Sequence, residues 1–354
     1  MSAATAKGKR SAGAKRIAGY GLLLVLALAA PFLLPAFKIQ LAMLWIMILF
    51  ALTWDIMGGQ MGYNSFGNIL FFGVGMYTTA VLQVGLFFDV GEYNTAQGAA
   101  GFVLSQMQYF AGLAAGLAVA AVLGVACAAV LGSGMLGLRG HYFAIGTLGL
   151  GIAAGEIASG WDWIGAGSGM VTPLFPGDIQ TRQLFFYFLS FALSAVTFLT
   201  LRRVYAGRFG LAVNAIRDDE DKAEAMGLHT TRIKTLAWCI SAFFLAMAGG
   251  IVGNIIGFID PRDVAFTGAT FGIWMVLMAI LGGKGTMWGP VIGAAVFHVT
   301  QEVFWTFLLG WQRVALGLLI VLIVVFFPRG IMGWLRERYP ERFGQRVEAR
   351  ETAP

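Results

Sequence analysis

Charge is scarce in this sequence. Only 12% of its 354 residues are Asp, Glu, Lys or Arg, about half of the share in a typical soluble domain, whereas 58% are hydrophobic and the mean hydropathy is +0.77. Such a chain has too few polar side chains to cover the surface of a water-soluble domain. The composition therefore excludes an ordinary soluble protein and indicates a polytopic membrane protein.

Residues that carry most enzyme chemistry are also few and scattered. The sequence contains three histidines, His141, His229 and His298, and no GxSxG or HExxH motif. Its two cysteines, Cys127 and Cys239, lie far apart in apolar runs and belong to no CxxC or metal-ligand pattern, so we expect them to be packing residues. This residue inventory indicates neither an enzyme nor a metal centre.

A complete phosphate-binding loop is missing as well. The segment 282–286, GGKGT, surrounds Lys284 with glycines, as a nucleotide-binding loop does. However, Met278 stands where the Walker pattern requires its first glycine, and Gly285 stands where the pattern requires Ser or Thr. We therefore expect no nucleotide to bind at this segment.

Long apolar runs dominate the chain, and a transmembrane helix needs about 20 mostly apolar residues. The first run follows a basic tail and contains Ala27-Leu28-Ala29, as a secretory signal does, but the parity of the spans requires it, so we interpret it as an uncleaved span. The short eighth run predicts a broken or re-entrant helix. We expect an all-α fold of about 10 transmembrane helices at 17–37, 39–57, 66–88, 109–132, 142–159, 182–201, 235–257, 269–281, 290–309 and 313–327.

The distribution of Lys and Arg predicts the orientation of these spans. If both termini are cytoplasmic, 20 of the 24 Lys and Arg residues lie on the cytoplasmic side, as the positive-inside rule requires. The net charge of +6 then belongs to a surface that faces anionic lipid headgroups and needs no nucleic-acid partner. The chain divides into a basic cytoplasmic tail, residues 1–16, a transmembrane domain, residues 17–327, and a cytoplasmic C-terminal tail, residues 328–354.

The longest polar interruption is the loop 202–234, between the sixth and seventh spans, with seven basic and five acidic residues. Within it, Asp218 to Met226 combines good helix formers with acidic residues in the first turn, and Gly227 follows where a helix would end. We expect a short amphiphilic helix with a glycine cap. Composition alone favours a plainer interpretation, a solvated loop whose charges keep it out of the lipid.

Glycine-rich stretches mark two of the predicted spans. Residues 55–79 contain six glycines, which favours either close helix packing or an unwound segment that lines a pathway. In the fourth span, Gly112, Gly116, Gly124 and Gly132 are separated by multiples of four residues. This spacing predicts a closely packed interior helix.

Acidic residues inside the spans are functional hypotheses by default. Glu156, on the fifth span, either lines a pathway or is a buried acid that is hydrogen-bonded to the glycine-rich backbone or to water. His298 and Glu302 share a face of the ninth span, but a metal site needs more ligands, so we expect polar pairing between helices. The outer loop 160–181 contains Gly-Ala-Gly-Ser-Gly, which suits either a tight turn or a polar vestibule.

Taken in order, these motifs resemble one known family. The segment 215–250, AIRDDEDKAEAMGLHTTRIKTLAWCISAFFLAMAGG, is very similar to the cytoplasmic loop and next span of permease subunits of branched-chain amino acid ABC importers, specifically the LivM-like subunit. The resemblance runs from about Trp54 to Gly333. Supporting matches are GNILFFGVGMYTT, LRGHYFAIGTLGLG, GAGSGM, LGGKGTMWGPVIGA and FFPRGIMG.

The resemblance implies a bacterial inner-membrane heterodimer of two permeases, two cytoplasmic ATPases that bind ATP and Mg²⁺, and a periplasmic substrate-binding protein. This chain itself would hold no cofactor. The resemblance also implies an inverted repeat that relates spans two to five to spans seven to ten. The counterpart of the helix that couples such permeases to their ATPases comprises Arg217, Asp218, Asp219, Glu220, Glu224, Ala225 and Gly227. Candidate pathway residues are Asn64, Tyr142, Phe143, Glu156, Gly167 and Ser168, with Asp162 and Asp260 as further candidates on the outer face.

The transported solute stays open at this stage. Relatives of this permease class serve branched-chain amino acids, urea, short amides and aromatic acids, and the stretch 54–68 is more polar than we expect for the family. An ion-coupled secondary transporter is the alternative class, with Asp55, Glu156 and Glu302 as its acidic candidates. A structural scaffold would explain neither the charged helix nor the glycine-interrupted spans.

Overall fold

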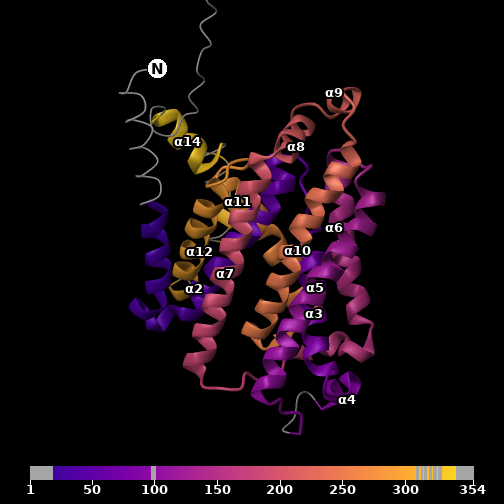
Figure 1. The fold of residues 1–354 in the computed structure, drawn as a ribbon, viewed down its shortest axis with the longest axis vertical. Helices are drawn as coiled ribbons and strands as arrows, with labels where there is room; N and C mark the ends of the chain where they lie inside the picture. Colours follow the sequence, from indigo (N-terminus) through magenta and orange to yellow (C-terminus); the bar gives the residue numbers. More distant parts are fainter. Residues whose placement is uncertain are drawn as a thin grey trace, which may run out of the picture.

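The long apolar runs form helices that stand side by side (Figure 1). The computed structural model describes residues 19–96, 101–307 and 329–339, with isolated positions between 311 and 325. Within these ranges, seven helical segments are long and apolar enough to cross a membrane: Pro35–Gln60, Asn68–Gly85, Gln106–Met135, His141–Ser159, Ile179–Ala206, Thr230–Ile256 and Pro261–Gly282. The chain is therefore an all-α polytopic membrane protein, as its composition predicted.

Two further apolar helices accompany these segments. Gly19–Leu33 lies where the first span is predicted, and α12 (Gly289–Phe307) lies where the ninth is predicted. The tail 1–16, most of the tenth span at 313–327 and most of the tail 328–354 lie outside the described residues, so the number of spans stays a prediction. The short helices are α4 (Val90–Thr95), α8 (Arg208–Asp218), α9 (Glu220–Ala225) and α14 (Gly330–Arg338).

The centre of the bundle consists of α3 (Asn68–Gly85), α5 (Gln106–Met135) and α10 (Thr230–Ile256), which pack on one another; α3 and α10 are the best-buried of the described spans. Glycine lets their backbones approach closely. A Cβ on Gly75 would lie 1.9 Å from the Ala246 carbonyl oxygen, and a Cβ on Gly249 would lie 2.0 Å from the Phe72 carbonyl oxygen. A larger side chain at either position would force α3 and α10 apart, so this part of the glycine-rich stretch serves helix packing.

The four glycines of α5 all face neighbouring helices. A Cβ on Gly112 or Gly116 would meet α3 within 3.1 Å, and a Cβ on Gly124 or Gly132 would meet α10 within 3.1 Å. The predicted close packing of this helix is thus confirmed. The prediction of an interior helix is wrong, however, because the opposite face of α5 is exposed along most of its length.

A second group contains α2 (Lys38–Asp55), α7 (Ile179–Ala206), α11 (Ile273–Gly282) and α12, in which α2 packs against the other three; α6 (His141–Ser159) packs instead beside α3 and α5. The Nε2 atom of His298 on α12 lies 2.8 Å from the Gln40 carbonyl oxygen on α2, a hydrogen bond that joins the two helices. The expected polar pairing at His298 is therefore present.

Regular helix geometry breaks at two joints. The first follows α2 and consists of the π-helix η2 (Ile56–Gln60) and the non-helical residues 61–67. The second follows α10 and consists of β2 (Phe258–Ile259), which pairs antiparallel with β1 (Met170–Val171), and the π-helices η5 (Pro261–Ala265) and η6 (Gly268–Gly272). The predicted eighth span is thus a broken helix. Both alternatives considered for residues 55–79 are therefore present: residues 61–67 are unwound, and the residues from Asn68 onward form a packed helix.

The two ends of the bundle differ in their loops. Figure 1 shows α8, α9 and α14 at one end and α4 at the other. The first of these ends, with α8, α9, α14 and the loop 136–140, is called the basic end below. Its basic residues are Arg139, Arg202, Arg203, Arg208, Arg217, Lys222, Arg232, Lys234, Lys284, Arg329, Arg336 and Arg338. Every described loop that the sequence predicts to be cytoplasmic lies at the basic end. The joint after α2 also lies there, whereas the joint after α10 lies at the opposite end, an arrangement that fits an inverted repeat.

Candidate functional site

The charged loop between α7 and α10 folds into two short helices. The first, α8, begins after Gly207 and buries Gly210, Val213 and Ile216, one residue per turn, against the bundle. The second, α9, begins at Asp219, whose extended backbone breaks the helix and whose side chain accepts a hydrogen bond from the Lys222 N–H at 3.0 Å. Asp219 is thus an N-cap, which satisfies a backbone donor that the helix itself cannot pair.

Gly227 ends α9 in the way its position predicted. Its φ of +89° is in the left-handed region, and its N–H donates to the Glu224 carbonyl at 2.9 Å. The Leu228 N–H donates to the Ala223 carbonyl at 3.1 Å, so the turn has both hydrogen bonds of a Schellman motif. The expected glycine-capped helix is confirmed, with α9 covering Glu220–Ala225 and α8 extending to Asp218.

A buried ion pair attaches α9 to the bundle. The Oε1 atom of Glu220 lies 2.7 Å from Nζ of Lys234 on α10, and the two side chains are 12% and 2% exposed. The Tyr63 hydroxyl, in the joint 61–67, donates a hydrogen bond to the other carboxylate oxygen of Glu220. The Lys234 ammonium also lies 4.6 Å from the centre of the Tyr63 ring, a cation–π distance. Glu220 therefore joins α9 to the next helix, 14 residues further on, and to a joint 157 residues earlier in the chain.

Arg139 holds the exposed side of the same helix. This residue lies in the loop between α5 and α6, and its guanidinium is 2.6 Å from Asp221, 3.5 Å from Glu224 and 3.8 Å from Glu220. Since all three acids belong to α9, one arginine ties the helix to a further part of the bundle. We call Tyr63, Arg139, Glu220 and Lys234 the α9 anchor.

The charges of the anchor support one another. Burial alone would raise the pKa of Glu220, but hydrogen bonds from Lys234 and Tyr63 and the charges of Lys234 and Arg139 hold that pKa below its ordinary value. Burial, followed by the hydrogen bond to Glu220, raises the pKa of Tyr63, so its hydroxyl stays a donor. The hydrogen bond with Asp221 raises the pKa of Arg139. At neutral pH the anchor therefore consists of charge-assisted hydrogen bonds to an ionised carboxylate.

Arg217 links the loop to the glycine-rich joint. Its Cγ lies 3.3 Å from the place that a Cβ on Gly62 would occupy, and its guanidinium pairs with Asp218 at 3.1 Å. Nearby, the Gly285 N–H donates to Oδ1 of Asp55 at 2.7 Å, which connects the end of α2 to the loop before α12. The glycine loop that resembles a phosphate loop thus makes a structural contact with a carboxylate.

The structure divides the seven predicted coupling residues into two groups. Glu220 faces the bundle, and Asp219 and Gly227 cap α9 at its two ends. Arg217, Asp218, Glu224 and Ala225 are exposed, and beside them Met226 is 86% exposed. The predicted set therefore comprises both the attachment of α9 and its free surface.

Sequence reasoning missed the partners of Glu220. Lys234 lies at the start of an apolar span, Tyr63 lies in a polar stretch 157 residues before Glu220, and Arg139 lies in another loop. One signal was available, because a lysine inside the first turns of a membrane span needs an acidic partner. The identity of that partner depends on the fold and could not be read from spacing.

Three pathway candidates lie together at the basic end. Asn64 is exposed next to Tyr63, and Tyr142, at the start of α6, is 77% exposed. Phe143 is fully buried, with its ring centre 5.5 Å from that of Tyr63 and 6.0 Å from that of Trp238. Phe143 therefore packs behind the α9 anchor, whereas Asn64 and Tyr142 face outward.

The other candidates lie at the opposite end of α6. Glu156 forms an ion pair with Arg262 of η5 at 2.7 Å, and the two side chains are 58% and 64% exposed. The alternative of a buried acid at Glu156 is therefore wrong, because an exposed arginine is its partner. Gly167 and Ser168 are exposed in the 3-10 turn η4 (Ala166–Ser168), where positive φ angles at the flanking glycines make tight turns. Asp162 is exposed on the same loop, and Asp260 caps η5.

The candidate residues thus form two groups, one at each end of the molecule, rather than one closed site. In the described part of the chain, no group of three or more His, Cys, Asp and Glu residues is arranged to hold a metal ion. A bundle of membrane-spanning helices with broken joints at both ends and a charged two-helix loop at one end defines a membrane transport subunit rather than an enzyme.

Comparison with known proteins identifies the kind of transport subunit. Residues 38–326 match the family model described as the permease component of branched-chain amino acid transport systems. The chain belongs to this family. It is accordingly a permease subunit of an ABC importer and not itself an enzyme, and the alternative of a secondary transporter falls away.

Individual relatives agree with the family match. The permease protein LivM of the high-affinity branched-chain amino acid transport system of Salmonella typhimurium is 27% identical over 91% of this chain and 76% of that protein. LivM of Escherichia coli is 27% identical over 89% of this chain and 74% of that protein. LivH of Salmonella typhimurium is 29% identical over 45% of this chain and 50% of that protein. No solved structure matches this chain. Similarity to both kinds of permease indicates a transporter with a second permease subunit.

Proposed function

We propose that this chain and a second, different permease subunit together form the path by which branched-chain amino acids, or a related small polar solute, cross a bacterial inner membrane. Two cytoplasmic ATPases bind ATP and Mg²⁺, and a periplasmic binding protein delivers the solute. Both chain termini face the cytoplasm. The substrate class rests on the transport systems to which the relatives belong, and urea, short amides and aromatic acids are the alternative solutes.

One observation carries the coupling part of this proposal: α9 is a capped helix with two different sides. Glu220 and Ala223 face the bundle, whereas Asp221, Lys222, Glu224, Ala225 and Met226 face away from it. Met226 exposes 86% of its surface at the tip of a charged loop, where an apolar side chain gains nothing from water. A docked ATPase would cover this surface.

The attachment of α9 connects a docked ATPase mechanically to the membrane-spanning helices. The α9 anchor joins α9 to α10, to the joint after α2 and to the loop between α5 and α6. A displacement of α9 therefore pulls on the first helix of the second half and on the joint of the first half together. Such rigid-body transmission suits a permease that opens its path alternately to the two sides. At the far end, the exposed loop with Asp162, Gly167 and Ser168 is the surface offered to the binding protein.

The docking surface can be tested by replacing Met226 with Asp. The change adds a charge to a side chain that has no role in the fold, so the permease should insert and stay folded while the ATPases are lost. Co-purification of the ATPases with a tagged permease, followed by uptake of radiolabelled solute in vesicles, measures the effect. We expect at least a tenfold loss of both. Leu174→Asp is the matched control for ATPase recovery, because Leu174 is 80% exposed in the loop 172–178 at the end away from α9. Full ATPase recovery with Met226→Asp contradicts the proposed docking.

Glu224→Lys tests the neighbouring position. Since Glu224 also lies 3.5 Å from Arg139, this change places two cations together and loosens α9 itself. We expect normal insertion of the complex but reduced solute-stimulated ATPase activity. Arg139→Gln combined with Glu224→Lys removes the repulsion between the two cations and separates the two causes, with Arg139→Gln alone as the reference because Arg139 also holds Asp221 and Glu220. Recovery in the double variant assigns the defect to α9 attachment, and continued loss assigns it to the ATPase contact.

A further inference from the structure

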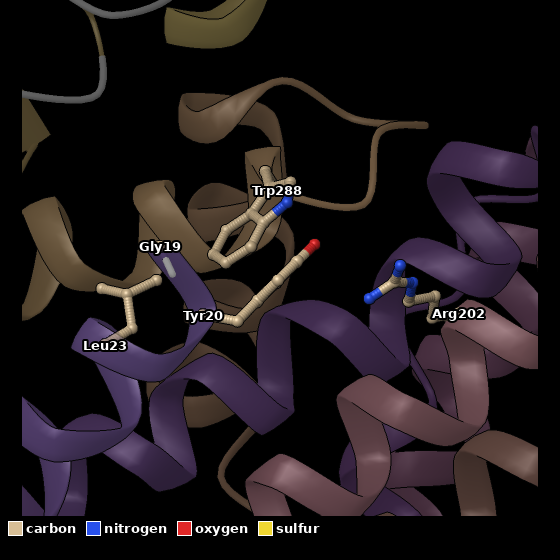
Figure 2. Close-up of a pocket in the computed structure, with 5 residues that line it drawn as sticks. All are labelled: Gly19, Tyr20, Leu23, Arg202 and Trp288. Carbon is tan, nitrogen blue, oxygen red and sulfur yellow. The ribbon is translucent and has the colours of Figure 1, made fainter. Parts of the chain in front are cut away.

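A hollow of about 610 Å³ opens beside the end of α7 at the basic end. It is lined by Gly19, Tyr20 and Leu23 of the helix Gly19–Leu33, by Arg202 of α7 and by Trp288, which precedes α12 (Figure 2). Three segments far apart in the sequence thus build one concave site. Its volume lies within the usual range of small-molecule pockets, and neither the permease family nor the proposed function assigns it a role.

The walls of the hollow are aromatic on one side and cationic on the other. The rings of Tyr20 and Trp288 stack with centroids 5.8 Å apart, and the Trp288 ring also packs on Phe198 at 5.1 Å. Figure 2 shows the Tyr20 side chain directed from its helix toward Arg202. The Arg202 guanidinium carbon lies 5.2 Å from the Tyr20 ring centre, within cation–π distance. The Tyr20 ring, which stacks on Trp288, therefore orients the guanidinium without neutralising its charge.

Arg202 keeps its charge available to a ligand. Across the described ranges, no carboxylate forms an ion pair with it, whereas Arg139, Arg217, Arg262 and Arg329 all have acidic partners. Its guanidinium is exposed and presents a planar set of donors that fits two oxygens of a phosphate. The Arg202 guanidinium can therefore bind an oxyanion.

The surroundings indicate what kind of molecule carries that oxyanion. Leu22, Leu23 and Leu26, on the same helix as Tyr20, are 62%, 51% and 51% exposed, so apolar surface continues from the hollow toward the middle of the membrane. Deeper in the membrane, the Tyr187 hydroxyl donates to the Ala27 carbonyl at 2.5 Å and joins this helix to α7. The space between the two helices is therefore open at the membrane surface and closed below.

We propose that this hollow binds the headgroup phosphate of an anionic phospholipid of the cytoplasmic leaflet. Arg202 holds the phosphodiester, the stacked rings of Tyr20 and Trp288 form the wall at the depth where aromatic side chains favour the membrane interface, and an acyl chain lies along Leu23 and Leu26. A lipid fits both the charged and the apolar parts of the site, whereas a soluble anion fits the charged part alone. The attraction of one arginine for an anionic leaflet, about 1 kcal/mol, corresponds to about a fivefold change in affinity.

The test compares two neighbouring arginines of α7. Arg202→Gln removes the charge inside the hollow, and Arg203→Gln removes the same charge from an exposed position that does not line it. The full chain, purified in detergent, is titrated with phosphatidylglycerol, with phosphatidylcholine and with inorganic phosphate, and bound molecules are counted by native mass spectrometry. Tyr20→Leu, which removes the stacked ring and keeps every charge, is the second variant.

The wild-type chain should retain phosphatidylglycerol in preference to phosphatidylcholine. Arg202→Gln should weaken phosphatidylglycerol binding about fivefold and Tyr20→Leu should weaken it as well, while Arg203→Gln changes it less than about twofold. Equal losses in Arg202→Gln and Arg203→Gln would show a diffuse surface charge and overturn the proposal. Inorganic phosphate that binds in an Arg202-dependent manner and displaces the lipid would also overturn it, because the ligand would then be a free anion.

Discussion

Two ion pairs of the same length lie at opposite ends of this permease and differ in their surroundings. Glu220 and Lys234, at the basic end, are 2.7 Å apart and almost fully buried, with Tyr63 bonded to the same carboxylate. Glu156 and Arg262, at the other end, are also 2.7 Å apart, but more than half of each side chain is exposed. The distance between the charges therefore does not determine how much a pair contributes to stability. Water screens the Glu156–Arg262 pair, whereas it is excluded from the Glu220–Lys234 pair.

The difference fits what each end has to do. A buried pair holds its partners rigidly because a displaced charge would remain without a partner in an apolar environment, so α9 moves together with α10 and the joint after α2. An exposed pair separates at little cost, so the outer loop can rearrange when another protein approaches. In the proposed function, the basic end transmits force to the membrane-spanning helices, and the opposite end adapts to a partner.

Lys234→Met should have the largest effect on stability. It leaves the Glu220 carboxylate buried without its main partner, which costs about 3–5 kcal/mol. Thermal unfolding of the purified chain in detergent, at one scan rate, should show a clearly lower midpoint. Lys222→Met is the matched control, since Lys222 also pairs with an acid of the loop, Asp219 at 2.9 Å, but its side chain is 83% exposed. Equal unfolding midpoints for the two variants would show that the burial of the Glu220–Lys234 pair does not increase its contribution to stability.

Removing both partners of the buried pair should be less harmful than the single changes suggest. In Glu220→Gln with Lys234→Met, no unpaired charge remains inside, and the introduced amide still accepts a hydrogen bond from Tyr63. A double-mutant cycle should therefore give a coupling energy of about 1–3 kcal/mol. The equivalent cycle on Glu156→Gln and Arg262→Gln should give less than about 1 kcal/mol. Similar coupling energies at the two ends would contradict the claim that burial strengthens the Glu220–Lys234 pair relative to the exposed pair.

Acid should weaken the attachment of α9 at the basic end. Because the folded-state pKa of Glu220 is lowered, its contribution to stability is present above the pKa of the unfolded chain and is lost as the pH falls through the folded-state value. The midpoints of wild type and Glu220→Gln should therefore differ at neutral pH and converge in acid. Unfolding midpoints measured from neutral to acidic pH check this expectation. A difference that persists unchanged at the lowest pH contradicts it.

Glu156→Gln should have the smallest effect. An exposed pair contributes at most about 1 kcal/mol, so the unfolding midpoint should stay close to that of the wild type. The same variant should keep its ATPase partners, since Glu156 lies at the end away from α9. A strong loss of stability would mean that the outer joint depends on this pair more than its exposure allows.

The comparison also shows what could be predicted from the sequence. The short helix and its cap at Gly227 were predictable because Asp219 and Gly227 act through their own backbone neighbours. The packed glycines of α5 followed from their spacing along one helix face, and the break in the eighth span followed from its short apolar run. In each case the cause lies within a few turns of the residue.

The direction in which Glu220 points was not predictable, because its partners lie in other segments. Tyr63 is 157 residues away, and Lys234 is one of seven basic residues in or beside the loop. Likewise, the exposure of Glu156 depends on where η5 places Arg262, 106 residues further along the chain. Local signals specified the elements, and long-range packing decided which of their charges face inward.

The proposed coupling of this permease rests on an ATPase that docks on the exposed side of α9. A photo-crosslinking amino acid in place of Met226, in the full chain in its native membrane, tests this docking most directly, with the same substitution at Leu174 as the control. After irradiation, the tagged chain is purified and its adducts are identified by mass spectrometry. We expect an ABC ATPase joined at position 226 and absent at position 174. Adducts at position 226 that contain lipid or other proteins, but no ATPase, would contradict the proposed docking.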